Sequence, residues 1–96
     1  MSSYYFTPAA IRDLTEIYDF IAEDNTMAAS RQLDAFEEKC QLLADSPGIG
    51  RKREDLANDL RSFPIGSYII FYRLQNTHIQ IIRILHAARD ISSDLI

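Results

Sequence analysis

The residues of this 96-residue chain most able to do chemistry are arginines and one histidine in its C-terminal third. Arg61, Arg73 and Arg83 each lie in one of three consecutive segments with the composition of β-strands, and His86 and Arg89 follow the last of them. Charged residues are mostly excluded from packed interiors. Apolar, β-rich segments therefore do not need this many guanidinium groups for packing, and we expect part of the set to face a partner or a substrate.

One hypothesis for this set is a ribonuclease site. His86 can exchange a proton near neutral pH, because an unperturbed imidazole has a pKa of about 6.5. His86 would be the general base, and Arg61 or Arg83 would stabilise the charge that develops on the phosphate. The second titratable group that general acid–base catalysis normally uses is missing. The alternative is a hydrogen bond between His86 and the backbone or Asp90, and we expect no catalytic residues.

A second hypothesis is a cationic patch, formed if Arg61, Arg73 and Arg83 share one face of the sheet. The alternative is that these arginines pair with carboxylates of the helical half, in contacts worth about 0–1 kcal/mol each when exposed. Arg89 also has two interpretations: it faces a partner, or it forms a local ion pair with the neighbouring Asp90.

The densest basic cluster is Arg51-Lys52-Arg53. It is either a solvated loop or a contact for a partner, since loops often carry function.

The net charge of −4 is divided unevenly along the chain. Residues 1–48 carry three basic and nine acidic side chains, a net charge of −6, and residues 49–96 carry seven basic and five acidic ones, a net charge of +2. Because nucleic-acid affinity depends on neutralising phosphates, an acidic protein gains little from long-range attraction. We expect a focused contact, and no sequence-specific binding of nucleic acid by the chain alone.

Several classes of protein are disfavoured by the composition. Cys40 is the single cysteine and the two histidines lie far apart, so we expect no disulfide framework, no metal site and no cofactor. The first residues do not combine a basic region with an apolar run, and no apolar segment approaches the roughly 20 residues that span a bilayer. These features predict a cytoplasmic protein without a signal peptide.

Two amphipathic helices are predicted in the N-terminal half. Thr7-Pro8 is typical of an N-cap followed by proline at the first helical position. Apolar residues then recur at helical spacing, which predicts helices over Pro8–Asp24 and Met27–Asp45. The turn at Asn25-Thr26 is short enough to make them an antiparallel pair.

The remaining segments predict a sheet. Four stretches have strand composition: Tyr4–Phe6, Leu60–Phe63, Tyr68–Leu74 and His78–Leu85. Residues 50–55 form a charged connector, and turns are predicted at Pro64–Ser67 and Gln75–Thr77. The last two strands are apolar on both faces near their middles, as expected for strands covered by helices.

We therefore predict one α+β domain over residues 1–96. A short N-terminal strand precedes a two-helix antiparallel hairpin, which packs on a three- to four-stranded antiparallel sheet. Residues 91–96 form a short tail that either frays or docks on the sheet or on a partner.

Several segments resemble the ParE branch of the RelE/ParE toxin superfamily. They are Gly50-Arg51, Leu60–Gly66, Tyr68–Arg73 and Arg83–Asp90, and the similarity runs through nearly the whole chain from Phe6. The resemblance implies the toxin of a type II toxin–antitoxin module, of the kind linked to plasmid stabilisation. It also implies inhibition of DNA gyrase, with the enzyme trapped on cleaved DNA, and neutralisation by a ParD-like antitoxin.

The sister branch, the RelE-type toxins, implies an alternative: a ribosome-dependent messenger RNA endoribonuclease with His86, Arg61 and Arg83 as its candidates. Such toxins are typically rich in basic residues and use a tyrosine, histidine or glutamate at the sheet. This chain has a pI near 5.0, only two lysines and no tyrosine after Tyr72. We therefore expect a toxin that is not an enzyme.

The candidate residues follow from these expectations. For the target they are the C-terminal basic groups Arg51, Arg53, Arg61, Arg73, Arg83, His86 and Arg89. For the antitoxin they are residues of the apolar helical stripes, Ile11, Leu14, Tyr18, Leu33 and Phe36, where these stay exposed as a groove. The sequence leaves open a homodimer or a toxin–antitoxin heterotetramer.

Overall fold

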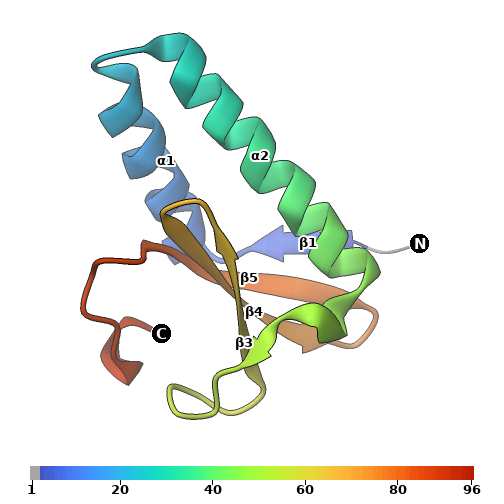
Figure 1. Cartoon of the computed structure of the whole chain (residues 1–96). Coiled ribbons are helices and arrows are strands. Elements are labelled where there is room, and N and C mark those ends of the chain that lie inside the picture. Colours follow the sequence, from blue (N-terminus) through green and yellow to red (C-terminus); the bar gives the residue numbers. More distant parts are fainter. Residues whose placement is uncertain (1–2) are drawn as a thin grey trace.

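The computed structural model describes residues 3–96, and it places a helical hairpin against a five-stranded sheet (Figure 1). The elements in chain order are β1 (Ser3–Phe6), α1 (Pro8–Ala22), α2 (Thr26–Asp45), the 3-10 turn η1 (Pro47–Ile49), β2 (Arg51–Lys52), β3 (Leu60–Ile65), β4 (Tyr68–Gln75), β5 (His78–His86) and the 3-10 turn η2 (Ser93–Leu95). The strand order is β1-β5-β4-β3-β2.

The two helices form at the predicted positions. The side chain of Thr7 caps α1 by accepting the backbone N–H of Ala10 at 3.1 Å, and Pro8 occupies the first helical turn. Asn25 caps α2 in the same way through the N–H of Ala28, at 3.0 Å. Side-chain caps satisfy N–H groups that have no partner inside the helix, which fixes where each helix begins. The far end of the hairpin projects beyond the sheet (Figure 1).

Neither helix in the described part of the chain is long and apolar enough to span a membrane.

The α+β class is confirmed, but the sheet differs from the prediction in strand number and direction. It has five strands and is mixed, because β1 pairs in parallel with β5 while the other pairs are antiparallel. The extra strand is β2, in the segment predicted as a charged connector, where Arg51 pairs with Ser62 and Lys52 with Arg61. Charged side chains are common on edge strands, where they discourage pairing with other chains.

The predicted turn at Pro64–Ser67 is too long, because β3 continues through Pro64 to Ile65. Ile65 pairs with Tyr68 across a two-residue loop, so the neighbouring pair, Pro64 with Ile69, is one whose backbone groups point away from each other. A proline without an N–H fits there because β2 does not reach this part of the edge. Gly66, with φ of 57°, supplies the left-handed residue of the loop.

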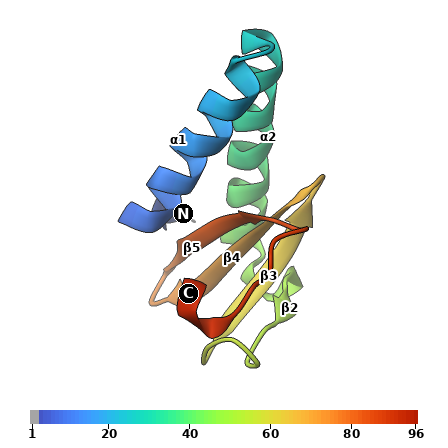
Figure 2. The ribbon, with the colours of Figure 1, turned by 90° about the vertical axis from the view of Figure 1, so that its left-hand side faces the viewer.

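Apolar side chains cover both faces of the sheet, and a different part of the chain covers each face. The helices pack on one face, where Phe36, Cys40 and Leu43 of α2 meet Ile70, Tyr72, Ile79, Ile81 and Ile84. Burial raises the pKa of the Cys40 thiol to about 12, which keeps it protonated. On the opposite face Leu60, Phe71, Ile82 and Leu85 are covered by Leu56, Ala57, Ile91, Leu95 and Ile96. Figure 2 shows the C-terminal segment crossing this face, so the tail docks on the sheet.

Candidate functional site

Arg83 on β5 is held in place by a helix and by the C-terminal tail. Its Nε and Nη2 donate to the two carboxylate oxygens of Asp13 on α1 at 2.7 and 2.8 Å, and its Nη1 donates to the carbonyl of Leu95 at 2.6 Å. The side chains of Arg83 and Asp13 are only 17% and 7% exposed. Hydrogen bonding to Asp13 raises the pKa of the Arg83 guanidinium further. Arg83 therefore joins three segments that are far apart in the sequence.

Asp13 lies beside β5 because β1 is short. The last pair of β1 is Phe6 with Ile81, so the following residues of β5 have no strand on that side. Thr7 fills part of the gap, since its Oγ1 donates to the carbonyl of Ile82 at 2.8 Å. One carboxylate oxygen of Asp13 accepts the backbone N–H of Ile84 at 3.0 Å. Thr7 and the first turns of α1 thus supply hydrogen bonds to the backbone groups of Ile82 and Ile84 that no strand pairs with. Buried backbone groups need such partners.

Arg61 lies beside a buried tyrosine at the start of the β2 segment. Tyr72 Oη donates to the carbonyl of Pro47 at 2.7 Å and accepts the N–H of Gly50 at 2.9 Å. Arg61 Nη1 donates to the carbonyl of Gly50 at 2.7 Å and to that of Gly48 at 3.3 Å. Burial is the main cause that raises the pKa of the Tyr72 hydroxyl. These bonds fix the path of the chain from α2 into β2.

Two further arginines also have local partners. Arg73 donates from Nε and Nη2 to the carbonyl of Asn58, at 3.3 and 3.1 Å. Arg53 pairs with Asp55 at 3.2 Å and lies 5.7 Å from the centre of the Phe71 ring. The hydrogen bond from Arg53 lowers the pKa of the Asp55 carboxyl. Arg51 and Arg89 are exposed and form no ion pair within residues 3–96.

The three strand arginines do not share one face of the sheet. Directly paired residues project to the same face. Arg61 pairs with Tyr72, which packs under the helices, whereas Arg73 pairs with Leu60 on the tail-covered face. Arg83 pairs with Phe71, also on the tail-covered face. A single patch of all three is therefore excluded, and the alternative of an ion pair with the acidic helices holds for Arg83.

His86 ends β5 away from Arg61. Its Nδ1 accepts the backbone N–H of Ala88 at 3.0 Å, and its ring lies edge-on to Tyr68 at 5.3 Å. This is the backbone alternative expected for His86. Tyr68 and Tyr72, the β4 partners of His86 and Arg61, are four residues apart, a separation of about 13 Å along a strand. The structure does not bring His86, Arg61 and Arg83 together around one point.

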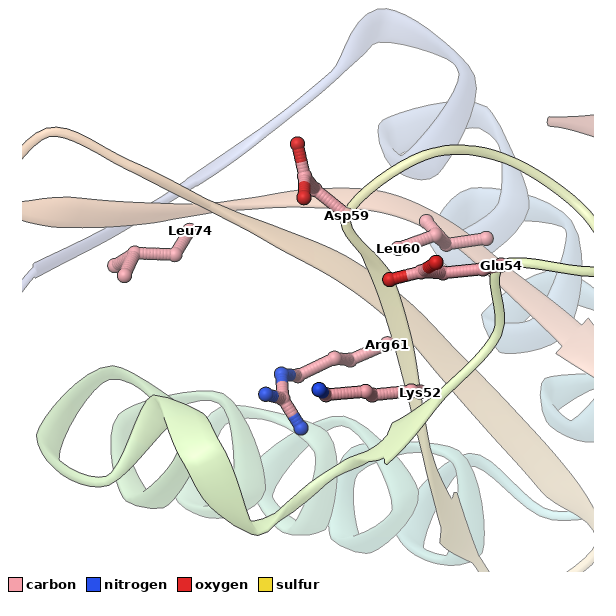
Figure 3. A pocket seen from close by; sticks show the side chains of 6 residues that line it. All are labelled: Lys52, Glu54, Asp59, Leu60, Arg61 and Leu74. Atoms are coloured by element: carbon pink, nitrogen blue, oxygen red, sulfur yellow. The ribbon is translucent and has the colours of Figure 1, made fainter.

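A pocket of about 310 Å³ lies at the β2 edge of the sheet, and we call it the β2-edge pocket. Its lining residues are Lys52, Glu54, Asp59, Leu60, Arg61 and Leu74 (Figure 3). The side chains of Lys52 and Arg61 lie next to each other and point the same way, with Glu54 and Asp59 on another side of the pocket (Figure 3). Arg61 is a candidate from the sequence, whereas Lys52 is not singled out there, because the β2–β3 pairing that joins them has no clear sequence signal.

A second hollow, of about 280 Å³, lies between the helices, and we call it the inter-helix groove. It is lined by Leu14, Thr15, Tyr18, Asp19 and Leu33, three of which are candidates for antitoxin contact. Ile11 is 53% exposed one turn away, whereas Phe36 is 1% exposed and packs in the core. Phe36 faces the sheet because α2 turns that side of its stripe inward, so it cannot form part of an exposed groove.

The chain is similar to known toxins along most of its length. A family model described as the ParE toxin of the type II toxin–antitoxin system parDE matches residues 4–91. Toxin ParE3 of Caulobacter vibrioides is 32% identical over 84 residues, which are 86% of this chain and 84% of that toxin. Toxin RelE2 of the same bacterium is 33% identical over 89 residues, or 93% and 99% of the two chains.

Two solved structures share the fold. A chain of the chromosomal ParDE system from P. aeruginosa superposes with a TM-score of 0.74 at 24% identity, covering 90% of this chain and 96% of that one. A chain of the RelBE2 toxin–antitoxin complex from Mycobacterium tuberculosis superposes with a TM-score of 0.63 at 23% identity, covering 92% and 93%.

Proposed function

The chain belongs to the ParE toxin family of type II toxin–antitoxin systems, and on that premise we propose that it inhibits DNA gyrase by binding it, without chemistry of its own. The observation that carries the proposal is the bonding of Arg83. All three of its guanidinium nitrogens donate to Asp13 or to the Leu95 carbonyl, so this arginine is used by the fold. An arginine that stabilises a phosphate in a transition state must aim its donors at the phosphate, whereas Arg83 is oriented by Asp13 and its charge is already paired with that carboxylate.

His86 supports the same proposal. Its Nδ1 already accepts a backbone N–H, so a neutral ring would carry its proton on Nε2. A general base must be within hydrogen-bond reach of the proton that it removes, and a second group must return a proton to the leaving oxygen. Among the described residues, no hydrogen bond joins His86 to a second titratable side chain, and its ring contacts the partly buried Tyr68 edge-on at 5.3 Å.

The proposal is tested with purified toxin and purified gyrase. Supercoiling of relaxed plasmid should stop at stoichiometric toxin, and linear, cleaved DNA should accumulate. Unchanged supercoiling at that ratio would reject gyrase as the target. Because gyrase acts on chromosomal and plasmid DNA, the proposed site of action is the cytoplasm.

A second function is favoured by one observation, the 33% identity to a toxin named RelE2. In that case the protein would cut messenger RNA on the ribosome, with His86, Arg61 and Arg83 as candidates. His86→Ala separates the two functions: a binding toxin should still arrest growth when expressed, and a nuclease that depends on His86 should not. Discrete cuts in messages on translating ribosomes would support the nuclease.

We also propose that a ParD-like antitoxin neutralises this toxin by placing an amphipathic segment in the inter-helix groove. The support is the groove itself, with apolar side chains from Leu14, Tyr18 and Leu33 reaching solvent between the helices. The helical half carries a net charge of −6, so a segment with apolar and basic side chains would fit it. Two or four chains could assemble in this way, as a heterodimer or a heterotetramer.

Tyr18→Asp should weaken antitoxin binding by about tenfold or more, because buried tyrosines are frequent hot spots of interfaces. The measurement is isothermal titration calorimetry with the cognate antitoxin. Phe20→Asp is the matched control: it also puts a carboxylate in place of an aromatic ring on α1, but Phe20 is 71% exposed and does not line the groove. Equal losses for the two variants would contradict the groove as the binding site.

A further inference from the structure

The β2-edge pocket contains two cationic side chains that the fold leaves without an acidic partner. Lys52 and Arg61 are direct partners in the β2–β3 pairing, so both project from the same face of the sheet. Like charges placed directly opposite each other on neighbouring strands destabilise a sheet. Neither forms an ion pair within residues 3–96. An anion bound between them would remove this repulsion.

Arg61 is held in place and still has donors to spare. Its Nη1 is anchored on the carbonyls of Gly48 and Gly50, whereas its Nε and Nη2 form no hydrogen bond with the described residues. The side chain is therefore oriented before any ligand arrives, and less conformational entropy is lost on binding. A planar guanidinium fixed in this way suits a carboxylate or a phosphate oxygen.

An apolar side chain is exposed beside the two cations. Leu74 lines the pocket and is 56% exposed. An exposed leucine beside oriented charge is typical of protein contacts, whose core is apolar and whose rim is polar. Glu54 and Asp59 complete the rim of the pocket.

We propose that the β2-edge pocket binds an acidic side chain of the toxin's protein target, carried on a segment that also places an apolar side chain on Leu74. This inference rests on the proposed function, in which the target is DNA gyrase. Lys52 and Arg61 hold the carboxylate, and Glu54 and Asp59 restrict the pocket to a single, locally placed negative charge.

A nucleic-acid backbone fits the pocket less well. Its phosphates repeat along the strand and would come near Glu54 and Asp59 as well as near the two cations. Phosphate affinity grows with the number of phosphates neutralised, and this chain offers two cations here at a net charge of −4. A single carboxylate with an apolar neighbour matches both the charges and the exposed side chains.

The test uses substitutions whose effects have opposite signs. Lys52→Glu replaces an attractive charge with a repulsive one, and it should raise the toxin concentration needed for half-inhibition of gyrase about tenfold. Asp59→Asn removes a repulsive charge and should lower that concentration by about twofold. Asn is suited to position 59, whose φ is 61°, because Asn adopts the left-handed conformation at least as readily as Asp. A folding defect cannot produce the gain.

The matched control is Arg31→Glu, which reverses an exposed charge on α2 away from the pocket and should leave inhibition unchanged. Lys52→Gln is a milder second variant in case Lys52→Glu does not fold, as judged by circular dichroism. If wild-type toxin inhibits gyrase and Lys52→Glu and Lys52→Gln inhibit it equally well, the inference is overturned and the proposed function stands. If the wild type does not inhibit gyrase, the proposed function itself fails.

A binding measurement separates the two sources of the anion. Toxin affinity for DNA-free gyrase subunits, measured by biolayer interferometry, should fall about tenfold with Lys52→Glu. If Lys52→Glu instead changes only binding to a DNA duplex or to messenger RNA, the pocket holds phosphate and the inference is wrong.

Discussion

Arg83→Ala should lower the free energy of unfolding by about 3–5 kcal/mol, because it leaves the buried carboxylate of Asp13 without its partner. Asp13 is 7% exposed and would keep only the N–H of Ile84 as a donor. The Leu95 carbonyl would also lose the N–H that it accepts, which loosens the tail. Domains of this kind have total stabilities of about 5–15 kcal/mol, so the loss is a large fraction. Urea unfolding followed by circular dichroism measures it.

A double-mutant cycle shows whether the loss comes from the pair. Asp13→Ala combined with Arg83→Ala should cost less than the sum of the single substitutions, by about 1–3 kcal/mol. Arg89→Ala is the control, because Arg89 is exposed and makes no contact that the fold requires, and its effect should stay within about 0.5 kcal/mol. A loss of under about 1 kcal/mol for Arg83→Ala would mean that Arg83 is available for function.

Gly50→Ala should cost at least about 3 kcal/mol, from steric overlap and from the loss of hydrogen bonds in a packed region. A methyl group at this position would overlap Tyr72 Oη and lie 2.7 Å from Cε1 of the same ring. The ring has nowhere to move, because Tyr72 is fully buried and its hydroxyl is bonded to Pro47 and Gly50. The backbone is not the cause, since Gly50 has φ of −72° and ψ of 152°, which alanine adopts freely.

Two comparisons separate this steric effect from other causes. Gly48→Ala, two residues earlier, should change stability by less than about 0.5 kcal/mol, because nothing lies within 4 Å of the added methyl. Tyr72→Phe should partly rescue Gly50→Ala, since it removes the atom nearest to the methyl. Equal stability of the Gly50→Ala and Gly48→Ala proteins, measured as the unfolding midpoint, would show that Tyr72 can give way.

The helical half could be predicted from the sequence because its signals are local. Thr7-Pro8 and Asn25 act as caps at the expected places, and the apolar spacing indicates both helices. The sequence alone does not determine whether residues 91–96 fray or dock, because a six-residue tail with three apolar side chains can do either. The other face of the sheet decides it, since Phe71, Ile82 and Leu85 need a cover that the helices do not reach.

The partners of the arginines could not be predicted, because these contacts join residues that are far apart in the sequence. Arg83 and Asp13 are 70 residues apart, and their pairing follows from β1 being too short to cover the end of β5. In the same way, the cation pair of Lys52 and Arg61 exists because a two-residue strand forms at an edge. The position of β2 along β3 depends on the hydrogen bond from Tyr72 to Pro47 in the 3-10 turn, and not on the local strand propensity of Arg51-Lys52.

The most direct test of a toxin that acts by binding alone is a gyrase cleavage assay with the His86→Ala protein. Linear DNA should accumulate at the same toxin concentration as with the wild type, because the Nδ1 of His86 bonds its own backbone and inhibition by binding needs no proton transfer. The opposite result is wild-type toxin that leaves gyrase untouched and cuts messages on ribosomes, with His86→Ala abolishing the cuts. That outcome would contradict the proposed function.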